Sequence, residues 1–227
     1  MSSVRKTASE IVRVCRRLYE RGLIAGPDGN VSVRVGKDRL LATPTGMSKC
    51  DVGLSDLVEL SLDGEQRHGT RAPSSEILMH LRIYARRPEV MAVVHAHPPA
   101  ATAFAVAREP VMDAVLPEVI LQMGTVALVP YAAPGTRALA DSLDPFLAGH
   151  DAFLLANHGA TTIGPSLTAA HQRMESLEHA AKILLGARLL GRVTMLSESD
   201  VHELRARRER DAGVQAGSLA PDSGRKR

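Results

Sequence analysis

Aromatic residues are scarce in this chain, whose 227 residues include no tryptophan, three tyrosines and three phenylalanines. Nucleic-acid bases stack on such rings, so their scarcity argues against a protein that binds single-stranded nucleic acid. The net charge is +3, but residues 203–227 alone carry seven Lys or Arg against four Asp or Glu and so hold the whole surplus. We interpret this basic end as a solvated tail, and we expect no nucleic-acid partner.

The sequence also lacks long apolar runs and closely spaced cysteines. No apolar run approaches the roughly 20 residues that a membrane-spanning helix needs. Residues 1–19 are charged throughout and do not contain the apolar stretch of a secretory signal. Cys15 and Cys50 stand far apart, and we interpret them as free thiols in a reducing compartment. These absences predict a cytoplasmic protein without a membrane partner.

The spacing of apolar residues predicts helices interleaved with short strands, and we find no internal repeat. We expect helices over residues 4–21, 73–87, 100–106, 135–147 and 167–190, and strands over residues 31–35, 39–43, 58–62, 90–97, 126–130 and 152–156. This order indicates an α/β layered domain without the strict alternation of a Rossmann fold. Residues 1–200 would form this domain. Residues 201–227 lose apolar periodicity, and we expect a disordered tail there.

Three histidines follow predicted strands and indicate a metal site. His95 and His97 end the strand at residues 90–97, and side chains two residues apart on a strand project from the same face. His158 follows the strand at residues 152–156, within the motif Asn157-His158-Gly159. Three protein ligands with one open position are typical of catalytic zinc. A lone H-x-H pair also occurs by chance, and spacing alone does not establish that the two strands are neighbours.

A second set of candidate ligands lies on one helix. His171, Glu175 and His179 stand at i, i+4 and i+8 of the helix at residues 167–190, so they share one side. Leu177 and Leu184 belong to the apolar stripe of the same helix. We therefore interpret the His/Glu side as a polar stripe that faces outward, and we favour the strand histidines as metal ligands.

Polar turns offer candidate sites for a phosphate and for acid/base chemistry. Ser74, Ser75 and Glu76 stand where a helix is predicted to begin, so the serines serve either as a structural cap or as anion ligands. A carboxylate beside a divalent metal, as we predict for Glu76, can ligate the metal and then act as a general base. Two further turns offer N–H donors without bulk: Gly29-Asn30 and Thr43-Pro44-Thr45-Gly46.

Five short motifs, in this order and spacing, resemble those of the class II aldolase/adducin family, most closely its L-fuculose-phosphate aldolase branch. They are G-N-V-S at 29–32, T-P-T-G at 43–46, P-S-S-E at 73–76, V-V-H-A-H-P at 93–98 and N-H-G at 157–159. The match extends from residue 4 to residue 190, which is nearly the whole globular part. No single motif is specific for this family, but the five motifs in this order are.

The resemblance implies a three-layer domain with a central, mostly antiparallel sheet flanked by helices, in a homotetramer with active sites near subunit interfaces. It implies zinc on His95, His97 and His158, although imidazole ligands also accept Mn²⁺ or Co²⁺. It implies Glu76 as the catalytic acid/base. A ketose phosphate similar to L-fuculose 1-phosphate would be cleaved between C3 and C4, through an enediolate, to dihydroxyacetone phosphate and a small aldehyde. Its phosphate would be bound by Gly29, Asn30, Thr45, Gly46, Ser74 and Ser75.

Two departures from the family pattern concern the aldehyde side of the site. In the fuculose-phosphate enzymes a tyrosine from a neighbouring subunit protonates the aldehyde, and the alignment places Leu116 at that position. No tyrosine follows Tyr131, so a C-terminal tyrosine contact is missing as well. Glu118 is a candidate replacement acid. These departures put the substrate in question and leave the predicted metal ligands unaffected.

Other members of the same family are alternatives. Pentulose-phosphate 4-epimerases resemble this chain but usually have aspartate in place of Glu76, which favours an aldolase. Sugar-acid-phosphate decarboxylases and thioribulose-phosphate dehydratases share the scaffold. A non-catalytic adducin-like binding module would lack the three histidines, and all three are present here.

Overall fold

One mixed sheet forms the centre of the molecule. The computed structural model describes residues 3–111 and 113–218, and the sheet has eight strands in the order β4-β3-β2-β1-β5-β8-β7-β6. Neighbouring strands are antiparallel except for β6 and β7, which are parallel. The strands are β1 (Asn30–Gly36), β2 (Arg39–Ala42), β3 (Val58–Leu60), β4 (Gln66–His68), β5 (Ala92–Ala96), β6 (Val126–Val129), β7 (Ala152–Leu155) and β8 (Gly159–Gly164).

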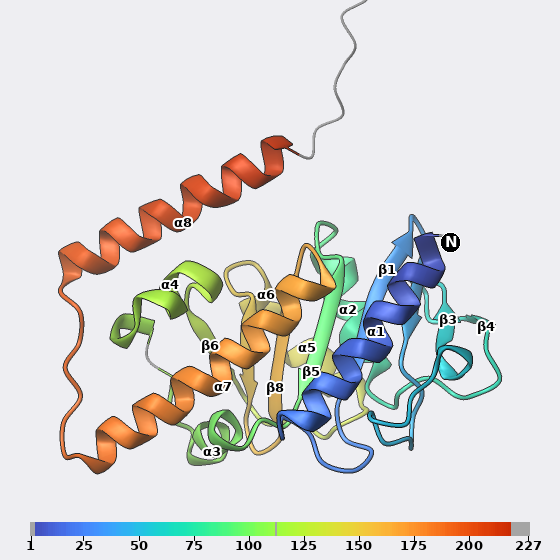
Figure 1. Cartoon of the computed structure of the whole chain (residues 1–227), viewed down its shortest axis with the longest axis horizontal. Coiled ribbons are helices and arrows are strands. Elements are labelled where there is room, and N and C mark those ends of the chain that lie inside the picture. Colours follow the sequence, from blue (N-terminus) through green and yellow to red (C-terminus); the bar gives the residue numbers. More distant parts are fainter. Residues whose placement is uncertain (1–2, 112, 219–227) are drawn as a thin grey trace, which may run out of the picture.

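Helices cover both faces of this sheet (Figure 1). Each face has its own apolar core, one around Leu18 and Met174 and the other around Met79 and Phe153. The predicted three-layer fold with a mostly antiparallel sheet is thereby confirmed. The first face carries α1 (Ser3–Glu20), α3 (Pro99–Ala107), α4 (Pro117–Met123) and α7 (Leu167–Leu189), and the second carries α2 (Ile77–Arg86), α5 (Arg137–Ser142) and α6 (Asp144–Leu147).

Strand β5 lies in the middle of the sheet and is buried along its whole length. Ala92 and Val94 belong to the core beneath α1 and α7, and Val93 belongs to the core beneath α2. Because alternate side chains of a strand point to opposite faces, His95 lies on the same face as Val93. Burial on both faces accounts for the continuous apolar run in this segment. It also places a histidine on the side of the sheet where α2 begins.

Several elements differ from the sequence predictions. Strand β8 was not predicted, because its short Thr-Thr-Ile run stands between two glycines and offers little periodicity. Strand β4 and helix α4 were not predicted either, and α4 has only seven residues. The single helix expected over residues 135–147 is divided into α5 and α6. Pro145 explains this division, since proline has no N–H for a continuous helix and favours the first turn of a new one.

The expectation of a disordered tail from residue 201 was wrong for most of that segment. Residues 198–218 form helix α8 (Glu198–Ser218), and residues 219–227 lie outside the described residues. The segment is rich in Glu, Arg and Ala, which are strong helix formers even without an apolar stripe. Arg208 of α8 contacts Asp151 with 2.8 Å between Nη2 and Oδ2. Neither α8 nor any other described helix is long and apolar enough to cross a membrane.

Glu178 of α7 holds the start of α3, and its loss should destabilise the fold. Its side chain is 2% exposed, and its two oxygens accept the backbone N–H groups of Ala100 at 3.2 Å and Ala101 at 2.9 Å. Glu178→Ala leaves two buried donors without partners, which should cost about 2 kcal/mol or more and lower Tm by about 5 °C. Thermal unfolding followed by circular dichroism measures this shift.

The control for this prediction is the exposed partner of the same carboxylate. Lys182 lies 3.1 Å from Glu178 but is largely exposed, so the pair itself contributes little. Lys182→Ala should therefore leave Tm nearly unchanged. Equal Tm shifts in the two variants would show that the ion pair, and not the cap on α3, accounts for the stability.

Candidate active site

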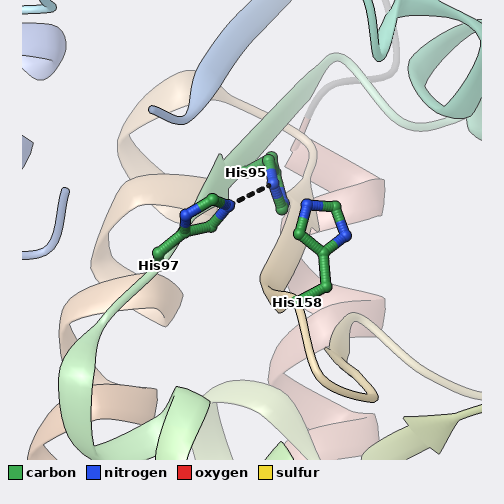
Figure 2. Close-up of side chains that lie close together, drawn as sticks. All are labelled: His95, His97 and His158. Carbon is green, nitrogen blue, oxygen red and sulfur yellow. Dashed lines mark hydrogen bonds between the residues drawn. The ribbon is translucent and has the colours of Figure 1, made fainter. Parts of the chain in front are cut away.

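Three histidine rings meet at one end of the paired strands β5 and β8. His95 lies in β5, His97 follows it, and His158 lies in the turn between β7 and β8. The ring centroids are 4.8 to 5.1 Å apart, and Figure 2 shows the rings turned toward a common centre. One candidate ligand atom from each ring lies within 4.8 Å of the others. The structure therefore brings the three predicted metal ligands together.

The backbone next to His158 explains how a turn residue reaches this centre. Asn157 has a left-handed φ of 55°, a conformation that asparagine tolerates better than most residues. At Gly159 an added Cβ would lie 2.5 Å from Cδ2 of His97 and 2.6 Å from the carbonyl oxygen of Ala96. Only glycine allows β8 to approach the end of β5 this closely. The N-H-G motif is thus a geometric requirement of the turn.

The orientation of the rings suits a divalent metal. His95 donates from Nδ1 to the carbonyl oxygen of Ala160 at 2.9 Å, and this bond orients its Nε2 toward the centre of the three rings. That Nε2 is 3.2 Å from Nε2 of His97, close to the edge of about 3.3 Å expected between two ligands of a tetrahedral zinc site. Nδ1 of His97 lies 3.3 Å from a carboxylate oxygen of Asp28. Such contacts to the second ring nitrogen commonly orient metal-binding histidines.

The protonation state of His97 also favours metal binding. Burial, together with the charges of His95 and His158, lowers its pKa from 6.5 to about 4. The ring is therefore neutral at neutral pH, which is the form that binds metals. Within the part of the chain that the structure describes, these three histidines are the only group of three or more His, Cys, Asp or Glu residues close enough to share a metal ion.

Glu76 lies against the triad at the start of α2. Its two carboxylate oxygens are each 3.1 Å from a histidine nitrogen, Oε2 from Nε2 of His95 and Oε1 from Nε2 of His158. Burial raises the pKa of this carboxyl, but the charge of His95 and the hydrogen bond from His158 outweigh burial and bring the pKa well below its ordinary value. An ionised carboxylate thus faces the centre of the three rings.

The three turns predicted to bind phosphate lie side by side next to Glu76. The backbone N–H of Val31 donates to Oγ1 of Thr43 at 3.1 Å, and the N–H of Ser74 donates to the carbonyl oxygen of Thr43 at 3.3 Å. The N–H of Thr45 donates to the carbonyl oxygen of Ala72 at 3.1 Å. These bonds bring together the turns that contain all six residues, Gly29, Asn30, Thr45, Gly46, Ser74 and Ser75. Of these, Asn30 also donates from Nδ2 to Oε2 of Glu76 at 2.9 Å.

Gly29 shows how closely these elements approach. Its φ is +71°, and an added Cβ would lie 2.8 Å from the carbonyl oxygen of His95. A larger residue would therefore separate the first turn from β5. Ser74 contributes a local bond as well, since its Oγ accepts the N–H of Glu76 at 3.3 Å. Helix α2 begins after Glu76 as its N-cap and has no side-chain cap bond, so the bond from Ser74 closes a local turn and is not the serine cap considered from the sequence.

The polar residues of α7 need one correction, and Glu118 lies apart from the triad. His171 does not face outward but is buried, since α7 packs against both the sheet and α1. Glu175 is half-buried and His179 is exposed, so these three residues do not converge on a point. Glu118, the candidate replacement acid, lies in a groove between α4 and α7. Among the described contacts of the chain, none joins it to the triad.

Sequence reasoning missed the buried residues behind Glu76. Ser32, His80 and Tyr84 form hydrogen bonds that lead to Asn30. A signal for them was present, because His80 stands four residues after Glu76 and therefore one helical turn further along the same face. Ser32 likewise follows Asn30 by two residues on one face of β1.

Removal of one predicted ligand should remove the metal. His95→Ala should lose most of its bound metal because two imidazoles hold a divalent ion far less tightly than three. Emission spectroscopy of the purified protein measures metal per chain. His150→Ala is the matched control, since that half-buried ring contacts the carbonyl oxygen and the ring of Phe146 and does not belong to the triad. Equal metal content in the two variants would contradict the assignment of His95.

Acid should destabilise the metal-free protein partly through His80. Burial and the charge of His95 lower the pKa of this ring from 6.5 to about 3. Between these pH values the unfolded chain binds a proton that the folded chain does not, so the free energy of unfolding falls by up to about 1.4 kcal/mol per pH unit as pH decreases. His80→Gln should therefore lose less stability between pH 6.5 and pH 4 than the wild type. Denaturant unfolding across this range measures the slopes, and parallel slopes would contradict the prediction.

Comparison with known proteins relates this geometry to a family. The profile of the Class II Aldolase and Adducin N-terminal domain matches residues 9–185. A 3-oxo-tetronate 4-phosphate decarboxylase of Escherichia coli K12 is 37% identical over 203 residues, which cover 87% of this chain and 94% of the relative. An L-fuculose phosphate aldolase of Methanococcus maripaludis is 35% identical over 175 residues, which cover 77% and 94%.

A solved structure agrees with these relatives. The structure of an L-fuculose 1-phosphate aldolase superposes with a TM-score of 0.83 at 32% identity, and the match covers 92% of this chain and 98% of that one. Fold, motif order and extent of similarity all coincide. The chain therefore belongs to the class II aldolase and adducin family.

Proposed function

We propose that this chain is a metal-dependent lyase that decarboxylates a 3-oxo sugar-acid phosphate. The relative from Escherichia coli carries this activity in its name and is similar over 94% of its length. A phosphorylated sugar or sugar acid suits the three adjacent turns beside Glu76, which offer backbone N–H groups and hydroxyls to an anion.

Decarboxylation and aldol cleavage share half of their chemistry. In 3-oxo-tetronate 4-phosphate the carboxylate is attached to C2, next to the ketone at C3. When CO2 leaves, the electron pair of the broken C1–C2 bond stays with C2 and is shared with the ketone oxygen at C3. The product is the enediolate of dihydroxyacetone phosphate. Cleavage of a ketose 1-phosphate between C3 and C4 leaves the same enediolate. The leaving groups differ, because an aldehyde forms only when a hydroxyl proton is removed, whereas CO2 leaves from a carboxylate that is already ionised.

The replacement of the family tyrosine on the aldehyde side favours decarboxylation. Leu116 occupies the position that aligns with the tyrosine of the fuculose-phosphate enzymes, and no tyrosine follows Tyr131. Tyr84 is engaged in buried hydrogen bonds with Ser32. A site that holds the enediolate but has leucine in place of this tyrosine is suited to a leaving group that needs no proton transfer.

Each group of the site then has a role in the proposed reaction. His95, His97 and His158 would hold the metal, zinc in our proposal, which supplies a Lewis acid for the ketone oxygen when bound. Glu76 would deliver to C2 the proton that replaces the carboxyl group. The reaction consumes one proton from solvent for each CO2 released. Glu76 is ionised in the free protein, so it has to take up this proton before it can deliver it to C2. The phosphate would be bound by Gly29, Asn30, Thr45, Gly46, Ser74 and Ser75.

We also propose a homotetramer with active sites near the subunit interfaces. The support is the family resemblance of the whole globular part. Within one chain no described contact joins Glu118 to Glu76 or to the histidines, so a role for Glu118 as an acid requires a neighbouring copy. Such a role would act on the leaving-group side of the substrate.

Aldol cleavage of a ketose phosphate is the second candidate function. It is supported by the Glu at position 76 and by the similarity to L-fuculose phosphate aldolases in sequence and structure. The two candidates use the same triad, the same phosphate turns and the same Glu76, so only the leaving group distinguishes them.

Product analysis separates the candidates. Zinc-loaded protein incubated with 3-oxo-tetronate 4-phosphate should release CO2 and dihydroxyacetone phosphate in equal amounts, with one proton consumed, and should act poorly on L-fuculose 1-phosphate. A coupled triose-phosphate assay together with CO2 detection measures both products. Triose release from fuculose phosphate without decarboxylation of the acid would establish the aldolase instead, and an epimerase would release neither product.

A variant of Glu76 belongs to the same experiment. Glu76→Gln keeps the size of the side chain and removes its proton-carrying ability, so kcat should fall by about 10²- to 10⁴-fold. Glu59→Gln is the matched control, because Glu59 has the same 8% exposure and binds only Arg39 at 3.2 Å. Unchanged kcat in Glu76→Gln would remove Glu76 from the mechanism, and a protein that never binds metal would favour a binding module.

A further inference from the structure

A buried row of polar side chains leads from the interior of the protein to Glu76. It consists of Tyr84, Ser32, His80 and Asn30, and every member including Glu76 is between 0% and 8% exposed. Glu76, His80 and Tyr84 are spaced by four residues along one face of α2, while Asn30 and Ser32 share one face of β1. The row therefore lies between helix α2 and strand β1. Such an interface is usually packed with apolar side chains, but here it consists of polar ones.

The distances define a continuous set of hydrogen bonds. Nδ2 of Asn30 is 2.9 Å from Oε2 of Glu76, and Oδ1 of Asn30 is 2.5 Å from Nε2 of His80. Nδ1 of His80 is 2.6 Å from Oγ of Ser32. The hydroxyl of Tyr84 is 2.9 Å from the same Oγ and donates to the carbonyl oxygen of Ser32 at 3.0 Å.

The amide of Asn30 fixes the direction of the bonds from Glu76 to Ser32. Its nitrogen only donates and faces Glu76, and its oxygen only accepts and faces His80. His80 then has to donate from Nε2, which makes its Nδ1 an acceptor. Ser32 in turn donates to that Nδ1. The opposite tautomer of His80 would turn the oxygen of Asn30 toward the carboxylate and place two acceptors 2.9 Å apart.

The orientation of Asn30 matters for more than Glu76. An amide nitrogen has two protons, and only one is donated to Glu76. The second proton is available to a phosphate oxygen, which is the role proposed for Asn30. A reversed amide would present its oxygen to both anions and repel both.

We propose that His80 is a positioning residue whose Nε2–H tautomer, supported by the hydroxyl of Ser32 at Nδ1, holds the Asn30 amide so that one nitrogen serves both Glu76 and the substrate phosphate. This assignment rests on the proposed function, because it uses the phosphate role of Asn30 and the acid/base role of Glu76. His80 touches neither substrate nor metal in this arrangement. It acts through Asn30, and it links the phosphate end of the site to the end where the proton is transferred.

The tautomer of His80 can be measured without substrate. Long-range ¹H–¹⁵N correlation spectra of the zinc-loaded protein distinguish imidazole protonated at Nε2 from imidazole protonated at Nδ1, and the spectrum of His80→Gln identifies the signals of His80. We expect the Nε2–H tautomer in the wild type and a mixture of tautomers in Ser32→Ala. An Nδ1–H tautomer in the wild type would overturn the proposal.

Ser32→Ala is also the variant for function, because it removes the hydroxyl that donates to Nδ1 of His80 and leaves the predicted metal ligands, Glu76 and Asn30 in place. Ser61→Ala is the matched control, since Ser61 is equally buried and its hydroxyl only accepts the N–H of Glu65. Ser32→Ala should bind phosphoglycolohydroxamate, a stable mimic of the triose-phosphate enediolate, about tenfold or more weakly by calorimetry. The control should bind it as the wild type does.

Kinetics and metal content complete the test. In Ser32→Ala the KM for the phosphorylated substrate should rise together with a fall in kcat, while zinc per chain stays unchanged. A purely structural role of Ser32 predicts a lower Tm with unchanged affinity for the hydroxamate, and that result would overturn the proposal. If the wild type decarboxylates no substrate yet binds the hydroxamate and shows the Nε2–H tautomer, the proposed reaction fails and the positioning role of His80 stands.

Discussion

The antiparallel pairing of β5 with β8 is the constraint on which the site depends. It sets His95 opposite Thr161 and Ala96 opposite Ala160, so the end of one strand and the start of the other lie at the same place. The turn before β8 then brings His158 to the end of β5. The same pairing supplies the carbonyl oxygen of Ala160 that holds the ring of His95. Strand pairing thus fixes both the position of a ligand and the nitrogen that it presents.

Glycine makes this pairing possible at two points of close approach. Gly159 passes next to His97 and Ala96, and Gly29 passes next to the carbonyl oxygen of His95, each at distances that exclude a side chain. The short motifs that carry the family resemblance therefore combine two kinds of residue. Some bear the polar groups, and others leave the room that those groups need in order to meet.

The sequence alone predicted those parts of the site that follow from local patterns. His95 and His97 end an apolar strand, Glu76 begins a helix, and both facts appear in the spacing of residues. Strand order is not a local property, so no pattern stated that β8 would be the neighbour of β5, and β8 itself was hidden between two glycines. The burial of His171 was missed for a related reason, since the side of α7 that faces α1 depends on the packing of the whole layer.

The buried polar residues behind Glu76 also could not be predicted from the sequence alone. The spacing of Glu76, His80 and Tyr84 along α2 was visible, but only the packing of α2 on β1 shows that Ser32 and Asn30 complete the row. A buried carboxylate is costly unless it is hydrogen-bonded. Asn30 donates such a bond to Oε2, and the nitrogens of His95 and His158 lie 3.1 Å from the two oxygens, so that their charge keeps Glu76 ionised while it is withdrawn from water.

The near-equal similarity to a decarboxylase and to an aldolase, at 37% and 35% identity, follows from what the two reactions share. Both must bind a phosphate, hold an enediolate and manage one proton, and these tasks fix the turns, the triad and Glu76 alike. The reactions differ only where the second product leaves, which is a matter of few residues. Leu116 and Glu118, our candidates for that side, lie on or next to α4. A comparison over the whole chain therefore identifies the common half of the chemistry, whereas in our proposal the residues around α4 distinguish the leaving groups.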